Sequence, residues 1–141
     1  MKLTTVLTNE RRTRVEARCQ TNLMAWLTTV NSSGKPNTVP VWFFVTHNDQ
    51  ILIYSQPGKA KLRNIDENPN VALGLDVTDL GRDIIRFEGT AVRASDHPPA
   101  DQVPGYAAKY AERIAAIFGT VEQFAATFTE PILISLTRLH A

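Results

Sequence analysis

The sequence predicts a mainly β domain with peripheral helices, in which six strands form a closed or nearly closed antiparallel barrel. Six segments of the 141-residue chain alternate apolar and polar residues or are rich in β-branched ones, which is typical of strands. Short clusters of turn-forming residues join the first three segments. These strands must pair antiparallel, because parallel neighbours need a long crossover. We expect one domain over residues 1–141, a usual domain size.

The first element is predicted to be a helix from Thr8 to about residue 20, because this segment is polar and poor in β-branched residues. A thin apolar stripe through Leu7, Val15 and Cys19 would hold it against the core. Its four arginines are typical of a solvated helix face. A net charge of +1 argues against a nucleic-acid-binding protein, which usually carries a marked basic excess.

Three strands are expected next, over residues 23–30, 38–46 and 51–55. Turn formers at residues 31–36 make the first two a hairpin. Pro40 falls inside the second strand, although proline is tolerated in a sheet only at an edge or a bulge. Either a flat ring lies along the backbone where the ladder is interrupted, or an edge strand packs on a second subunit. Both readings can hold together.

The later elements are predicted from the periodicity of apolar residues and from the prolines and glycines that end helices and strands. They are expected, in chain order, as a helix over residues 59–68, strands over 71–77 and 83–94, a helical region over 106–117, a short helix opening at Thr120, and a closing strand over 132–136. Pro69 ends the first of these helices, and Gly119 is a plausible stop for the helical region. Thr120 and Gln123 have the spacing of a capping box.

Several classes of function find no support. The single cysteine excludes a disulfide framework and a cysteine-cluster zinc site, and the three histidines lie far apart, so we predict no metal site. No apolar run reaches the ~18–20 residues of a membrane span, and no signal peptide opens the chain. We therefore expect a soluble, cytoplasmic protein that binds neither membrane nor nucleic acid. The chain has no nucleophile elbow and no glycine-rich phosphate loop.

The stretch that carries chemistry runs over residues 53–65. A strand ends at Ser55, a Pro-Gly turn follows, and the next helix holds Lys59 and Lys61 in its first turn. Cations at a helix N-terminus cost ~0.3–1 kcal/mol each, because the exposed amides already carry partial positive charge. Two lysines there are favourable if an anion sits among them, so the stretch suggests a phosphate cradle. The alternative is a solubilising loop whose lysines face water.

Taken in order, these stretches resemble the FMN-binding split-barrel proteins of the pyridoxamine 5′-phosphate oxidase-like superfamily, most closely its small deazaflavin-dependent members. The resemblance covers about residues 20–139. No single motif is diagnostic, but the ordered set is fairly specific. The matching stretches are residues 27–30, 34–36, 39–43, 53–55, 59–65, 68–73 and 88–91, and the closing strand from Pro131.

The resemblance implies a homodimeric oxidoreductase that transfers a hydride to or from a small-molecule substrate, with its cofactor at the subunit interface. The cofactor would be FMN or, alternatively, a deazaflavin coenzyme. Lys59 and Lys61 would contact the cofactor phosphate. The other implied cofactor-binding residues are Ser55 and Gln56 beside the phosphate, Tyr54 next to them, and Val39, Pro40, Val41 and Trp42 along the ring system. No catalytic residue is assigned.

The chain departs from the family pattern at two places. It ends at Ala141 without the extension that holds pyridoxal phosphate in true pyridoxamine phosphate oxidases, which argues against that substrate. Residues 39–41 stand where an FMN-contacting arginine is expected, which makes a deazaflavin a competitor to FMN. The alternative function is a non-catalytic protein that binds or carries a flavin, a deazaflavin or haem. A third interpretation is a small barrel that binds single-stranded nucleic acid. The near-neutral net charge of +1 argues against it.

Overall fold

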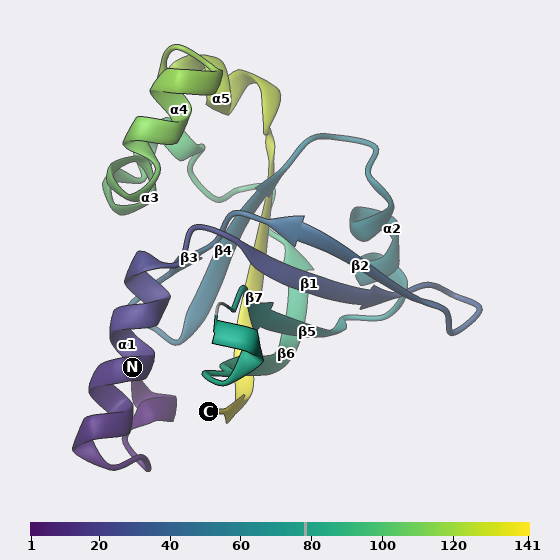
Figure 1. Ribbon diagram of the computed structural model, residues 1–141. Helices are drawn as coiled ribbons and strands as arrows, with labels where there is room; N and C mark the ends of the chain where they lie inside the picture. Colours follow the sequence, from purple (N-terminus) through teal and green to yellow (C-terminus); the bar gives the residue numbers. More distant parts are fainter. Residues whose placement is uncertain (78) are drawn as a thin grey trace.

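The protein is built on one curled sheet of seven antiparallel strands (Figure 1). The computed structural model describes residues 1–77 and 79–141. The strands are β1 (Ala25–Val30), β2 (Pro36–Val41), β3 (Phe44–Val45), β4 (Gln50–Ser55), β5 (Asn70–Leu75), β6 (Arg86–Arg93) and β7 (Glu130–His140). Their order in the sheet is β2-β1-β5-β6-β7-β4-β3. The predicted fold class, a mainly β antiparallel split barrel with peripheral helices, is confirmed.

The sheet has seven strands rather than six because the expected strand over residues 38–46 is divided. Its two parts, β2 and β3, lie at opposite edges of the sheet, and only Trp42 and Phe43 connect them. A link this short brings the two edges together, so the sheet must curl into a barrel. Pro40 lies in edge strand β2, where its missing N–H leaves no gap in the ladder.

Five α-helices surround the sheet among the described residues: α1 (Asn9–Thr21), α2 (Ala60–Glu67), α3 (Pro104–Lys109), α4 (Ala111–Ile117) and α5 (Val121–Thr127). Short 3-10 turns lie at Lys2–Thr4, Asp79–Gly81 and Ala100–Gln102. Figure 1 shows α3, α4 and α5 as one group beside the sheet and α2 apart from them, near β2. No helix of the described chain has both the length and the apolar character needed to cross a bilayer.

The expected helix starts and stops are confirmed where capping chemistry marked them. Thr8 caps α1 by accepting a hydrogen bond from the Arg11 N–H, and Thr120 and Gln123 form the capping box of α5. Gly119 has φ of 87° and closes α4 with its N–H on the Ile114 carbonyl.

The expected helical region over residues 106–117 is broken at Tyr110 into α3 and α4, which a continuous period did not predict. Tyr110 lies between the two helices with φ of −107° and ψ of 12°, outside helical geometry. The period placed Ile117 on the buried side, but this residue is 63% exposed, whereas Tyr106, Tyr110 and Ile114 are buried. The closing strand is also longer than expected, because β7 pairs with β6 as far as His140.

Two apolar cores meet at β4, which is buried on both faces. Ile51 and Ile53 point into the barrel, where they join the main core. Leu52 and Tyr54 point outward and pack under α3, α4 and α5 in a second, largely aromatic core. The helices therefore cover the outer face of β4, and this cover forms one wall of the candidate site.

Candidate functional site

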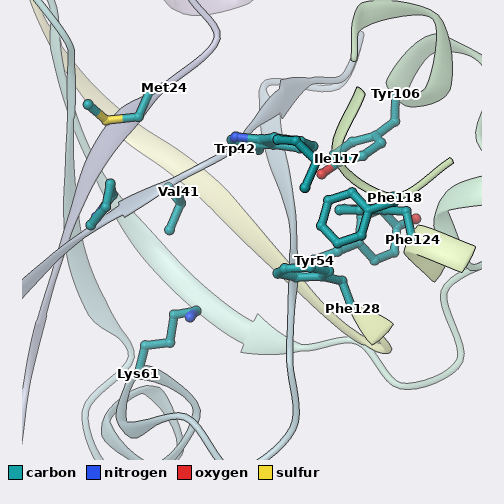
Figure 2. Close-up of a pocket in the computed structure, with 11 residues that line it drawn as sticks. Met24, Val41, Trp42, Tyr54, Lys61, Tyr106, Ile117, Phe118, Phe124 and Phe128 are labelled. Atoms are coloured by element: carbon teal, nitrogen blue, oxygen red, sulfur yellow. The ribbon is translucent and has the colours of Figure 1, made fainter. Parts of the chain in front are cut away.

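A cavity of about 290 Å³ lies where α2, the end of β2 and the helical cover approach one another (Figure 2). We call it the aromatic cavity. It is lined by Met24, Pro40, Val41, Trp42, Tyr54, Lys61, Tyr106, Ile117, Phe118, Phe124 and Phe128. Pro40 and Ile117 are both solvent-exposed, so the cavity is open at its rim. Lining of this kind, mostly apolar with a few polar groups, is typical of small-molecule sites.

Lys61 carries the only charge among the lining residues described. It stands in the first turn of α2, whose N-cap is Lys59, and it is half-buried. Burial lowers the pKa of Lys61, and the neighbouring charge of Lys59 lowers it further. No carboxylate among the described residues pairs with either ammonium group. An anion bound here would offset both effects and would also meet the N-terminal dipole of α2.

The other end of the cavity is a stack of aromatic rings around Trp42. The indole lies parallel to the Tyr110 ring, with 4.6 Å between centroids and 3° between planes. It also stacks on Phe124 at 5.5 Å, and Phe128 continues the stack at 4.7 Å from Phe124. Phe118 meets Trp42 edge-on at 6.3 Å. Figure 2 shows this cluster on one side of the cavity and Lys61 on the other, so the two ends differ in chemistry.

The Trp42–Phe43 link that shapes this wall is held by side chains from the junction of α3 and α4. The Phe43 N–H donates to Tyr110 Oη at 2.7 Å. Lys109 Nζ donates to the Phe43 carbonyl at 2.8 Å and to the Cys19 carbonyl at 3.1 Å. These bonds satisfy backbone groups that no neighbouring strand pairs, and they tie the cavity wall to the helical cover.

Two tyrosines of the cavity differ in the hydrogen bonding of their hydroxyl groups. Tyr54 Oη donates to the Pro98 carbonyl at 2.7 Å. Tyr106 is completely buried, and its hydroxyl has no hydrogen-bond partner among the described residues. Burial raises the pKa of both phenols, so both are protonated at neutral pH.

The residues implied as cofactor-binding separate into two groups. Pro40, Val41, Trp42, Tyr54 and Lys61 come from β2, the link that follows it, β4 and α2, and they line the aromatic cavity together. The remaining four, Val39, Ser55, Gln56 and Lys59, are not among its lining residues.

These four take other positions around the same elements. The Val39 side chain packs against the main core. Ser55 is buried, and its hydroxyl donates to the Gln56 carbonyl at 2.8 Å. Lys59 is exposed at the start of α2.

Sequence reasoning missed half of the cavity wall. Met24, Tyr106, Ile117, Phe118, Phe124 and Phe128 line it, but none of them was assigned to the site from the sequence. An aromatic stripe on a short helix is typical both of a helix packed in the core and of a helix that lines a binding site. No local sequence signal distinguishes these two cases. Lys109 was missed as well, because its role depends on carbonyl groups of segments more than 60 residues away.

Comparisons with known proteins agree on the fold. The family model for pyridoxamine 5′-phosphate oxidase matches residues 12–132. Among solved structures, the haem storage protein HutZ of Vibrio cholerae is similar with a TM-score of 0.65 at 12% identity, covering 92% of each chain. An F420 reductase is similar with a TM-score of 0.66 at 19% identity, covering 89% of this chain and 94% of that one.

A third similar structure is a proposed pyridoxamine 5′-phosphate oxidase of Listeria innocua, with a TM-score of 0.65 at 16% identity, covering 91% of this chain and 94% of that one. No match was found among curated proteins. Identities this low show a shared fold and leave the ligand to be argued from the cavity.

Proposed function

The chain belongs to the pyridoxamine 5′-phosphate oxidase family, and from that premise we propose that it is an oxidoreductase whose flavin-type cofactor, FMN or a deazaflavin, binds in the aromatic cavity. One observation supports this most strongly. A half-buried ammonium group, which no carboxylate of the described chain pairs with, and a flat aromatic wall stand at opposite ends of one cavity. A phosphorylated molecule with a planar ring system has matching ends.

The lysine end fits a phosphate group. Lys61 would bind it directly, and Lys59, exposed at the N-cap of α2, would add a second positive charge. The first N–H groups of an α-helix have no intrahelical partner and favour an anion. Charge-assisted hydrogen bonds to phosphate are among the stronger ones in proteins, so this end would supply much of the affinity.

The apolar end fits the ring system. When bound, a flavin-type ring supplies the hydride transfer, so the protein needs no nucleophile or acid–base pair of its own. This chain would bind the ring along Pro40–Trp42, which leaves the side chains of the helical cover free to face a substrate. Ile117 and Phe118 would limit the access of water to the reacting face.

We propose that a second copy of the chain completes the site. About 290 Å³ is at the lower limit for a ligand pocket, so one chain encloses only part of such a cofactor. Trp26, 43% exposed, pairs in register with Pro40 of the cavity rim and with Gly74. These three residues form a flat apolar surface on the outside of the barrel, beside the cavity. A homodimer would bury that surface and close the open side.

The alternative, a haem-binding or carrier protein, has weaker support from the cavity. None of its described lining residues is a histidine or cysteine, which are common haem ligands. Haem carriage would therefore depend on a tyrosine, on Met24 or on a residue of another chain.

Spectroscopic titration tests the proposal. The purified protein, titrated separately with FMN, F420 and haem, is expected to bind FMN or F420 and to shift its visible absorption bands. With the bound cofactor reduced, acceptors should then reoxidise it faster than they reoxidise free cofactor. Binding of haem alone contradicts the proposal, and full cofactor occupancy without turnover favours a carrier.

A charge at the Trp26 surface tests the dimer. Trp26→Glu is expected to shift sedimentation velocity from dimer to monomer and to weaken cofactor binding at the same time. Val6→Glu, which places the same charge on an 88% exposed apolar residue outside the sheet, is the matched control. A monomeric Trp26→Glu variant with unchanged affinity would contradict an interface site.

A further inference from the structure

Tyr106 stands at the aromatic end of the cavity and is fully enclosed. It lies on α3 with its ring 5.0 Å from Tyr54, 5.0 Å from Tyr110 and 5.8 Å from Phe124. Its exposed fraction is 0%, yet it is one of the residues that line the aromatic cavity. Figure 2 shows the side chain projecting from its helix toward the cavity with the hydroxyl leading.

The Tyr106 hydroxyl differs from those of its two tyrosine neighbours because none of the residues that the structure describes pairs with it. Tyr54 donates to the Pro98 carbonyl, and Tyr110 bonds to backbone groups of Phe43 and Leu23. For Tyr106, no acceptor lies within reach among the described residues. Buried hydroxyls are normally paired, and an unpaired one destabilises the folded protein. Phenylalanine would fill the same space without that cost, so packing alone does not account for the oxygen.

The groups around this hydroxyl define what could pair with it. Ile117, Phe118, Phe124 and Phe128 line this end of the cavity with carbon atoms alone, so a charged group would lose its hydration here without compensation. Stacked rings favour a flat, conjugated partner. A phenol that stays protonated offers one hydrogen for donation.

We propose that Tyr106 donates a hydrogen bond to the substrate, and that the substrate is a flat, uncharged, conjugated molecule carrying an acceptor atom such as a carbonyl oxygen. The inference rests on the proposed function, since the molecule would lie beside the cofactor ring. The hydroxyl is closed off from water in the free protein, so the acceptor reaches it by displacing a lining side chain. Ile117 is 63% exposed and can change rotamer without disturbing the core.

Two probes of the same shape isolate the hydrogen bond. 2-Acetylnaphthalene carries a carbonyl oxygen, and 2-isopropenylnaphthalene carries a CH₂ group in its place. Their dissociation constants are measured by calorimetry with the wild type, Tyr106→Phe and Tyr54→Phe. Loss of one hydrogen bond should shift the ratio of the two constants about 5- to 10-fold toward the alkene in Tyr106→Phe. Tyr54→Phe, a matched control in the same cavity, should leave the ratio unchanged.

Thermal stability gives an independent readout. Because the Tyr106 hydroxyl has no partner in the free protein, Tyr106→Phe should keep or raise the melting temperature, by up to about 3 °C. Tyr54→Phe should lower it, because the variant loses the hydrogen bond from the Tyr54 hydroxyl to the Pro98 carbonyl. A structural role for the Tyr106 hydroxyl would instead lower the melting temperature of Tyr106→Phe.

Four results would overturn the inference: an unchanged probe ratio in Tyr106→Phe, a lower melting temperature for that variant, no binding of either probe to the wild type, or displacement of both probes by saturating cofactor. The probes are titrated into the protein as purified and into the protein saturated with the cofactor that it binds, so a probe beside the cofactor is distinguished from one in its place. Failure of the proposed function would show separately, as a wild type that binds neither FMN nor F420.

Discussion

The hydroxyl of Tyr110 lies between the backbone N–H and the carbonyl of Phe43, at 2.7 Å and 2.9 Å. It accepts from the N–H and can donate to the Phe43 carbonyl or to the Leu23 carbonyl, also at 2.9 Å. Phe43 belongs to the two-residue link between the sheet edges, where no strand ladder satisfies the backbone. A side chain from the α3–α4 junction therefore takes the place of a strand at the point where the barrel closes.

Tyr110→Phe should destabilise the protein more than its small change in volume suggests. The variant leaves the buried Phe43 N–H without an acceptor, which should lower the free energy of unfolding by about 1–3 kcal/mol. Urea denaturation measures it. Tyr106→Phe removes the same atom from a neighbouring, equally buried ring without breaking a bond and is the matched control. Equal losses of stability in both variants would contradict this role for Tyr110.

Lys109 should make stability depend on pH in the alkaline range. Burial lowers the pKa of Lys109 to about 8 from an ordinary 10.5. Between these values the unfolded chain holds more protons than the folded one, so stability rises with pH and the gain is complete above the unfolded pKa. The free energy of unfolding of the wild type, relative to Lys109→Met, should therefore increase from about pH 7.5 to about pH 9.5. Burial also raises the pKa of Cys19 to about 11, which lowers stability at high pH. Because the charge of Lys109 also affects the pKa of Cys19, both proteins are compared in a Cys19→Ala background, which removes the contribution of the thiol. A constant or falling difference would refute the assignment.

Two glycines in neighbouring strands should respond oppositely to alanine. A Cβ at Gly89 would lie 2.5 Å from the Ser135 carbonyl oxygen and 2.9 Å from Ile134 Cγ2, at the bulge where β6 and β7 shift register. Gly89→Ala should cost about 1–3 kcal/mol, because backbone must move to admit the methyl group. Within one chain a Cβ at Gly74 meets nothing within 4 Å, so in the Trp26→Glu background, where the proposed dimer surface is not buried, Gly74→Ala should be neutral or mildly stabilising. Thermal unfolding of the two variants measures the contrast, and similar melting temperatures would contradict the close approach.

Local signals predicted most of the barrel from the sequence. Strict alternation over residues 71–77 placed Val71 and Leu73 in the core, and the capping-box spacing of Thr120 and Gln123 marked the start of α5. The division of the strand at Trp42 was not predicted, because it depends on Tyr110, which lies 67 residues beyond Phe43 in the chain. No window around residues 38–46 contains that partner.

The candidate site was predictable only where its residues share a local motif. Lys61 stood out because a cation in the first turn of a helix conflicts with the helix dipole. The helical cover contributes Tyr106 and Phe118, whose positions depend on how α3, α4 and α5 pack against β4. Their spacing fits an ordinary core equally well, so their place on a cavity became visible only in three dimensions.

Lys61 is proposed to bind the phosphate of a flavin-type cofactor. FMN and riboflavin share the ring system and differ in the phosphate, so the ratio of their dissociation constants isolates that end. The wild type should prefer FMN, and Lys61→Met should reduce the preference by about 1–3 kcal/mol, roughly 5- to 150-fold, while riboflavin affinity stays nearly unchanged. Equal preference for FMN in the wild type and in Lys61→Met would contradict the claim.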